Sequence, residues 1–133
     1  MKECEFKRNN VKGGHGGGIS IRTNKLVLIE NCEFDNNIAN NNNQQDGSQG
    51  FGGAIYIMTS ISSDTGTGIE CTTSVSIKGS RFSNNQGYQG FSIYIQGSSK
   101  CQSTISITNN IFTNDHGTST PYSGGSIIAC EIT

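Results

Sequence analysis

The chain has 133 residues, the size of one domain, so a second independent core is not expected. Hydrophobic residues make up 32% and charged residues 14%, whereas disordered chains usually combine low hydrophobicity with high charge. With a net charge of −1 and no stretch apolar enough to cross a bilayer, we expect neither nucleic-acid binding nor direct membrane insertion.

The turn-forming residues point to an all-β fold. The chain contains 18 Gly among many Asn and Ser but only one Pro, Pro121. Such a composition is typical of short strands separated by tight turns, and it does not suit a helical bundle.

Four similar segments follow one another along the chain, and each begins with a Phe-x-x-Asn block. These blocks read CEFKRN at 4–9, CEFDNN at 32–37, SRFSNN at 80–85 and NIFTND at 110–115. A Gly-rich block then follows: GGGISI at 16–21, GGAIYI at 52–57, GFSIYI at 90–95 and GGSIIA at 124–129. A third block precedes the last three Phe: VLI at 27–29, VSI at 75–77 and ISI at 105–107. Repetition of this kind indicates a solenoid.

The spacing between blocks varies only at fixed places. Polar insertions at 40–50 and 59–73 lengthen the second segment, while each block keeps its internal spacing. A solenoid tolerates such insertions because a loop can leave the stack without disturbing it.

Apolar residues alternate within the blocks, as in Ile55-Tyr56-Ile57, which is the two-residue period of a strand. We therefore predict a right-handed, single-stranded parallel β-helix of about four coils, with three strands per coil and like residues stacked on like. The predicted inward rows are Phe6/34/82/112, Val27/Val75/Ile105, Ile29/77/107, Ile19/55/93/127 and Ile21/Ile57/Ile95/Ala129. We expect the row Asn9, Asn37, Asn85 and Asp115 to form the corners, because Asn tolerates the left-handed conformation. Gly at 16–17, 52–53 and 124–125 would allow sharp turns into the next strand.

Two outward rows test this register. One row is Lys2, Glu30, Lys78 and Thr108, and the other is Glu5, Glu33, Arg81 and Ile111. The first alternates in sign and the second sets an Arg against two Glu, so in-register stacking does not force an excess of like charges together.

The blocks resemble the repeats of the chlamydial polymorphic outer membrane proteins, which combine Phe-x-x-Asn with Gly-Gly-Ala-Ile. FDNN at 34–37 and GGAI at 52–55 match both halves, and the likeness covers nearly the whole chain. The resemblance implies a pectin-lyase-like β-helix and a cell-surface passenger, often adhesive. We treat residues 1–133 as a single β-helix domain and expect it to be a segment of a longer protein or fibre, because the sequence starts at a Phe block and stops after a Gly-Gly block.

The cysteines recur at equivalent positions. Cys71 and Cys101 each lie four residues before an apolar strand start, and in a stack they would be close enough for a disulfide, although free thiols are also compatible with the pattern. Cys4 and Cys32 each lie two residues before a Phe, at an inward position where two buried free thiols are at least as compatible with the pattern as a disulfide. Cys130 has no partner in the repeat.

Two outward aromatic residues are the candidate binding residues. Tyr56 and Tyr94 occupy the same outward position on adjacent coils, where they could stack on a sugar or contact a protein. Cross-strand aromatic pairing that only stabilises the sheet is the simpler interpretation of these two residues. His15 and His116 fall in turns at different distances from their Phe, so we expect surface residues without a catalytic or metal role.

The sequence predicts no catalytic residue, cofactor or metal site. Glu5 and Glu33 on neighbouring coils form the one carboxylate pair that a polysaccharide-cleaving enzyme of the pectin-lyase-like class could use, with Arg81 beside them. A solvated, charge-balanced row is the simpler explanation of these residues, because fold alone does not imply activity. We expect an extracellular or cell-surface module, adhesive or structural, that binds a glycan or a host or cell-surface protein, or associates end to end; a carbohydrate-active enzyme is the alternative.

Overall fold

The computed structural model describes residues 1–40, 50–59, 71–97, 101–117 and 125–130 of the chain, without the side chains of Cys71 and Cys130. These residues form 15 strands and contain no helix. The strands belong to four sheets, and every pairing between named strands is parallel. The all-β, parallel architecture predicted from the repeats is therefore confirmed.

We name each sheet after a characteristic residue or after the length of its strands. The phenylalanine sheet contains β1 (Glu5–Lys7), β5 (Glu33–Asp35), β9 (Arg81–Ser83) and β13 (Ile111–Thr113). The short sheet contains β2 (Asn10–Lys12), β6 (Ile38–Asn40), β10 (Gln86–Gly87) and β14 (His116–Gly117). The tyrosine sheet contains β3 (Ile19–Arg22), β7 (Ile55–Met58), β11 (Ile93–Gln96) and β15 (Ile127–Cys130). The long sheet contains β4 (Val27–Glu30), β8 (Cys71–Lys78) and β12 (Cys101–Thr108).

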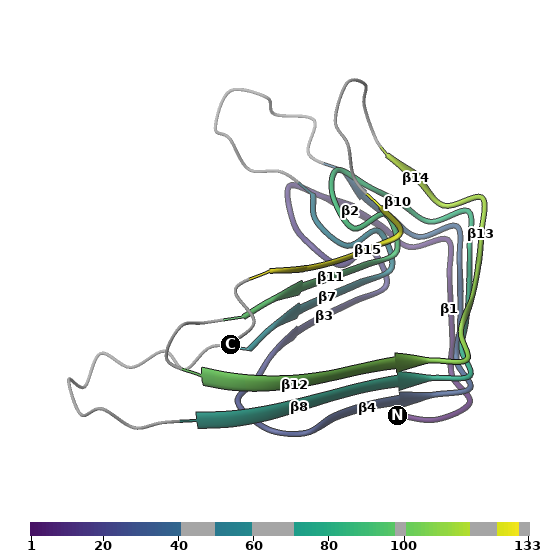
Figure 1. Cartoon of the computed structure of the whole chain (residues 1–133). Helices are drawn as coiled ribbons and strands as arrows, with labels where there is room; N and C mark the ends of the chain where they lie inside the picture. The colour runs from purple at the N-terminus through teal and green to yellow at the C-terminus, as the bar shows by residue number, and fades with distance from the viewer. Residues whose placement is uncertain (41–49, 60–70, 98–100, 118–124, 131–133) are drawn as a thin grey trace.

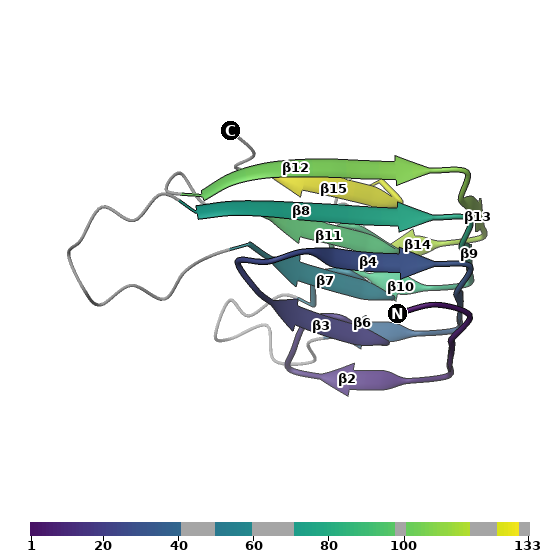
Figure 2. The same ribbon diagram turned by 90° about the horizontal axis from the view of Figure 1, so that it is seen from below.

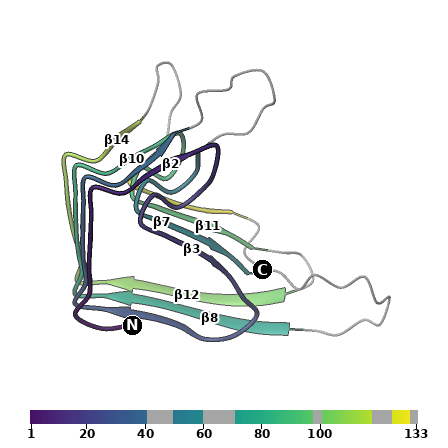
Figure 3. The same ribbon diagram turned by 180° about the vertical axis from the view of Figure 1, so that it is seen from behind.

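The chain visits the sheets in the same order on every pass, and we call one pass a tier; the first tier has no strand in the long sheet. The first tier is β1–β3, and β4–β7, β8–β11 and β12–β15 follow it. Figure 1 shows the long sheet along the bottom, the phenylalanine sheet on the right and the other two sheets above. Figure 2 shows the arrows of β4, β8 and β12 running side by side in one direction, and Figure 3 shows the short sheet beside the tyrosine sheet from behind.

Strands of successive tiers pair in the predicted register. Phe6 lies against Phe34, Phe34 against Phe82 and Phe82 against Phe112. The ring centroids are 5.1, 4.9 and 4.8 Å apart, with interplanar angles of 8°, 3° and 9°, so the four rings form one continuous column. The predicted rows of the long and tyrosine sheets also pair as expected.

Side chains from three of the sheets meet in one core. Phe34 and Phe82 are fully buried together with Ile29, Ile77 and the isoleucines of β7 and β11. Burying a side chain of this kind contributes about 1.5–3 kcal/mol, so a few continuous columns can stabilise a chain of low overall hydrophobicity.

The prediction of three strands per coil was wrong, because the short sheet adds a fourth. Its strands are two or three residues long, as in Gln86–Gly87. A strand of this length carries at most one inward residue, so it shows no two-residue period in the sequence. The predicted insertion at 59–73 also ends too late, since β8 already begins at Cys71; most of both insertions lies outside the described residues.

The Asn of the Phe-x-x-Asn block does not adopt the left-handed conformation predicted for it. That conformation belongs to the preceding residue: Arg8, Asn36, Asn84 and Asn114 have φ of 59°, 55°, 54° and 56°. Gly16 and Gly52, at φ of 69° and 66°, make the sharp turns expected before the tyrosine sheet.

The block Asn points inward and forms a hydrogen-bonded column that we call the amide ladder (Asn9, Asn37, Asn85, Asp115). Asn9 Nδ2 donates to Asn37 Oδ1 at 2.8 Å, and Asn37 Nδ2 donates to Asn85 Oδ1 at 3.0 Å. Asn85 Nδ2 donates to Asp115 Oδ1 at 3.2 Å and to the Phe34 carbonyl at 3.0 Å. Asn37 and Asn85 are fully buried, so the ladder satisfies polar groups that would otherwise destabilise the core.

We predict that Asn85→Ala lowers the free energy of unfolding by about 2–4 kcal/mol. The substitution removes the acceptor of the buried Asn37 backbone N–H and of one Asn37 side-chain N–H, and it removes a donor to the Phe34 carbonyl. Urea unfolding followed by circular dichroism measures the change. Asn10→Thr, at an exposed position of β2, is the control and should stay within about 0.5 kcal/mol of the unsubstituted chain. Equal effects of the two substitutions would contradict a stabilising ladder.

Candidate functional site

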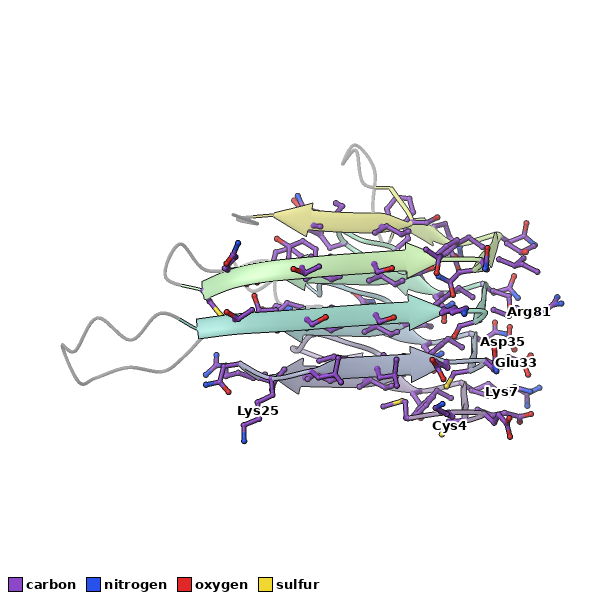
Figure 4. All side chains as sticks on the ribbon, turned by 60° about the horizontal axis from the view of Figure 1, so that its bottom comes forward. Cys4, Lys7, Lys25, Glu33, Asp35 and Arg81 are labelled. Carbon is purple, nitrogen blue, oxygen red and sulfur yellow. The ribbon has the colours of Figure 1, made fainter. Side chains whose placement is uncertain are left out.

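The outer face of the phenylalanine sheet carries the charged candidates. Glu5 pairs with Glu33 and Glu33 with Arg81 along the predicted row. Figure 4 shows Lys7, Glu33, Asp35 and Arg81 gathered along this face. These strand pairs confirm the predicted register. Within the described residues, however, no ion pair joins Arg81 to Glu33, so another residue compensates the charge of the two glutamates.

Lys7 supplies that charge. Its Nζ lies 2.8 Å from Glu33 Oε2 and 3.2 Å from Glu5 Oε2, so one ammonium bridges both carboxylates. Hydrogen bonds to Glu33 and then to Glu5 raise the pKa of Lys7 above its ordinary value. Lys7 was not among the residues predicted for this face, although its position one residue after Phe6 places it on the same side of the strand as Glu5.

Asp35 is the most strongly engaged carboxylate of this face. It accepts hydrogen bonds from Ser83 Oγ at 2.7 Å, Asn36 Nδ2 at 2.8 Å and Asn84 Nδ2 at 3.1 Å. The Ser83 hydroxyl, followed by the two amides, lowers the pKa of Asp35 below its ordinary value. Three donors that favour the charged form make Asp35 a fixed acceptor, which is poorly suited to donating a proton near neutral pH.

The second predicted outward row is also in register. Lys2 pairs with Glu30 and Glu30 with Lys78. Lys2 Nζ lies 2.7 Å from Glu30 Oε2, and this contact raises the pKa of Lys2 and lowers the pKa of Glu30. Exposed ion pairs of this type contribute little to the stability of the fold. Their value is as evidence that the strands pair in the predicted register.

Tyr56 and Tyr94 lie side by side on the outer face of the tyrosine sheet, as predicted, with ring centroids 5.9 Å apart. Their exposed fractions are only 6% and 8%, because two residues of the preceding turns cover them. His15 stacks on Tyr56 at 4.6 Å, and Phe51 stacks on Tyr94 at 4.6 Å. A ligand could not lie on the tyrosine faces unless it displaced these rings.

His15, Phe51, Tyr56, Tyr88 and Tyr94 therefore form one aromatic cluster. His15 and Phe51 are parallel, with centroids 5.0 Å apart and an interplanar angle of 5°. The Phe51 backbone N–H donates to His15 Nδ1 at 3.2 Å, and the Tyr56 hydroxyl donates to Gln96 Oε1 at 2.8 Å. His15, Phe51 and Tyr88 are half-buried, so they present the accessible part of the cluster.

The two histidines differ in their surroundings. His116 is exposed in β14, in agreement with the prediction of a surface residue. His15 was expected to be a surface turn residue, but it is half-buried because stacking on Phe51 and Tyr56 draws the turn onto the sheet. The sequence carried one signal for this, since His15 and Phe51 each lie four residues before an isoleucine of the tyrosine sheet.

Cys4 and Cys32 are free thiols, of which Cys32 is buried as predicted and Cys4 is only half-buried. They belong to a second polar column with Ser80 and Asn110. Cys32 Sγ accepts the Cys4 backbone N–H at 3.5 Å, and Ser80 Oγ accepts the Cys32 backbone N–H at 3.1 Å. Asn110 Oδ1 accepts the Ser80 backbone N–H at 2.8 Å. The Cys32 thiol therefore accepts the same type of backbone hydrogen bond that the Ser80 hydroxyl and the Asn110 amide accept in later tiers.

Cys101 is buried and disulfide-bonded. Its neighbour across the strand pair β8–β12 is Cys71, the partner predicted from the sequence. The side chain of Cys71 lies outside the described residues, as does that of Cys130, so the Cys71–Cys101 bond stays a prediction.

A search of the described residues for three or more His, Cys, Asp or Glu side chains that could share a metal ion finds no such group. Likewise, no helix in the described part of the chain has the length and hydropathy needed to cross a membrane. Comparison with protein-family models, with curated proteins and with solved structures finds no match to this chain.

We predict that Asp35→Asn reduces the loss of stability on acidification. The folded-state pKa of Asp35 is lowered, so its ionised form stabilises the fold above the unfolded-state pKa, and this contribution is lost as the pH falls through the folded-state pKa. Urea unfolding at about pH 7 and about pH 2 measures the difference. Glu3→Gln, which removes an exposed carboxylate, is the control; the same acid sensitivity in Asp35→Asn and the unsubstituted chain would contradict the assignment.

Peptide mapping without reduction tests the cysteine assignment. We predict a disulfide-linked peptide pair containing Cys71 and Cys101, together with alkylation of Cys4 and Cys32 once the protein is unfolded in the alkylating reagent. A Cys4–Cys32 linkage in the purified protein, or unlinked Cys71 and Cys101 after exposure to air, would contradict it.

Proposed function

We propose that this protein is a non-catalytic extracellular or cell-surface module with a structural or adhesive role. In finer detail, we propose a right-handed, single-stranded parallel β-helix of about four coils, of the pectin-lyase-like type found in polymorphic outer membrane protein repeats. The observation that carries the proposal is the in-register stacking of every repeated row. The residues that define the repeat, such as Phe34, Asn37 and Ile55, are buried and serve the stack.

The cysteine chemistry supports an extracellular setting. Cys101 is disulfide-bonded, and disulfides persist in oxidising compartments such as the cell surface. The buried thiol of Cys32 is compatible with the same setting, because it donates to the Glu30 carbonyl at 3.3 Å and is shielded from oxidants.

The outer charged face favours a non-catalytic role. Catalysis by Glu5 and Glu33 would need one carboxyl group available as an acid or a base, whereas Lys7 bridges both groups. The alternative, a polysaccharide-cleaving enzyme, rests on one observation, namely that the two carboxylates lie on adjacent tiers with Arg81 on the next.

The aromatic cluster is the surface best suited to an adhesive contact with a glycan or a cell-surface protein. Aromatic side chains supply large contact areas at little conformational cost, and they dominate binding energy in many interfaces. Tyr56 and Tyr94 would act as a support, while the half-buried rings of His15, Phe51 and Tyr88 would make the contact.

We predict that the purified chain releases no product from polygalacturonate or other polysaccharides, and that it binds a glycan array or intact cells of its source through the aromatic cluster. Phe51→Ala should weaken that binding about tenfold or more, because Phe51 is half-exposed and stacks on both His15 and Tyr94. Thr104→Ala, on the exposed face of the long sheet, is the control.

Three outcomes would count against this function. Polysaccharide cleavage that disappears in Glu33→Gln would identify the enzyme instead. Binding that is unchanged in Phe51→Ala would move the contact to another surface. Absence of labelling by an antibody applied to intact source cells would contradict a surface location.

A further inference from the structure

Cys4 and Cys32 form a stacked pair of thiols at the corner that leads into the phenylalanine sheet. Each lies one residue before a strand of that sheet, and the two strands, β1 and β5, pair in register. Cys4 Sγ donates to the Lys2 carbonyl at 3.2 Å, and Cys32 Sγ donates to the Glu30 carbonyl at 3.3 Å. Because each thiol contacts the carbonyl two residues before it, the two side chains share one orientation and lie one above the other.

The spacing of the tiers sets the distance between the two sulfur atoms. The rings of Phe6 and Phe34, two residues further along the same strands, are 5.1 Å apart, and paired strands in general lie about 4.8 Å apart. Two sulfur atoms at this separation are not bonded to each other, and both thiols are free. One ion fits between them, since two metal–sulfur bonds of about 2.3 Å in a straight line span about 4.6 Å.

The ligand set favours a soft cation that needs only two ligands. Thiolate sulfur selects Cu(I), which accepts two ligands in line, whereas Zn²⁺ takes four ligands and Ca²⁺ and Mg²⁺ take oxygen. Among the described residues, no group of three His, Cys, Asp or Glu side chains that could complete a zinc site is found. The Cys4 backbone N–H lies 3.5 Å from Cys32 Sγ, and a donor in this place favours the negative charge that the sulfur carries when it binds a metal.

We propose that Cys4 and Cys32 bind one Cu(I) ion between the first and second tiers. Binding releases both thiol protons to water, so two Cu–S bonds replace two S–H···O contacts and the site carries one net negative charge. No electron is transferred. Ser80 and Asn110 continue the same column with hydroxyl and amide groups, which are poor ligands for a soft cation, so one ion per chain is expected in this column.

Titration of the purified chain with Cu(I), without air and against bicinchoninate as a competing chelator, measures stoichiometry and affinity. We expect one equivalent to bind through two sulfur ligands in line, which X-ray absorption spectroscopy detects. Cys32→Ser should raise the dissociation constant about tenfold or more, because it leaves one thiol of the pair. Ser80 occupies the equivalent position of the next tier, so a serine fits the column, and circular dichroism checks that the variant folds.

Two double variants separate the geometry of the site from the number of thiols. Cys4→Ser with Ser80→Cys moves the stacked pair one tier along the column, to positions 32 and 80, and should restore binding. Cys4→Ser with Thr113→Cys contains equally many thiols, but the new thiol lies at an exposed position of β13 and should not restore it.

Weaker binding in Cys32→Ser, with recovery only in the double variant that restacks the pair, supports the proposal. Unchanged binding in a folded Cys32→Ser, or equal recovery in both double variants, would overturn it, because another thiol would then hold the ion. Absence of binding by the unsubstituted chain, or a ligand set other than two sulfur atoms, would also overturn it, and this last measurement decides even if Cys32→Ser does not fold. None of these outcomes depends on adhesion or on a surface location.

Discussion

Stacking in register is the constraint on which the rest of this structure depends. Each interior side chain must fit the residue of the same row in the tiers above and below it. The phenylalanine column meets this requirement by parallel ring stacking, and the amide ladder meets it by hydrogen bonds from one tier to the next. Among the described residues, every buried side-chain nitrogen and oxygen has a partner. A polar interior can therefore coexist with a small apolar core without the cost of unpaired groups.

The same constraint explains how chemically different residues share one column. Cys32 and Ser80 occupy equivalent positions, and each accepts a backbone N–H from the tier below while donating to a carbonyl two residues earlier. What the position requires is an acceptor of the right length, and a thiol meets that requirement. Repeated cysteines in such a stack are thus no sign of redox chemistry by themselves, whereas Cys101, in a long strand, is disulfide-bonded.

Most of the interior could be predicted from the sequence because repetition and alternation report it directly. The phenylalanine column, the isoleucine rows and both outward charged rows follow from aligning the four segments. The short sheet could not be predicted, since Gln86–Gly87 is too short to show a period. The left-handed conformation was predicted one position too late, at Asn37. Asn37 contributes through the hydrogen bonds of its side chain, whereas Asn36 is the residue whose backbone adopts the left-handed conformation.

The candidate site was harder to predict because its contacts run between rows. Lys7 in the first tier forms an ion pair with Glu33 in the second. The alternation of inward and outward residues predicts that both side chains lie on the outer face, but it does not predict that they contact each other. The outward position of Tyr56 was predicted, but its burial was not, since the turn residue His15 folds back over it from the preceding tier. Inner rows must match from tier to tier, whereas outer positions are free to differ, as Ser20, Tyr56, Tyr94 and Ile128 do along one row. The outer residues are therefore the ones that can change from tier to tier without disturbing the stack, and the aromatic cluster lies among them.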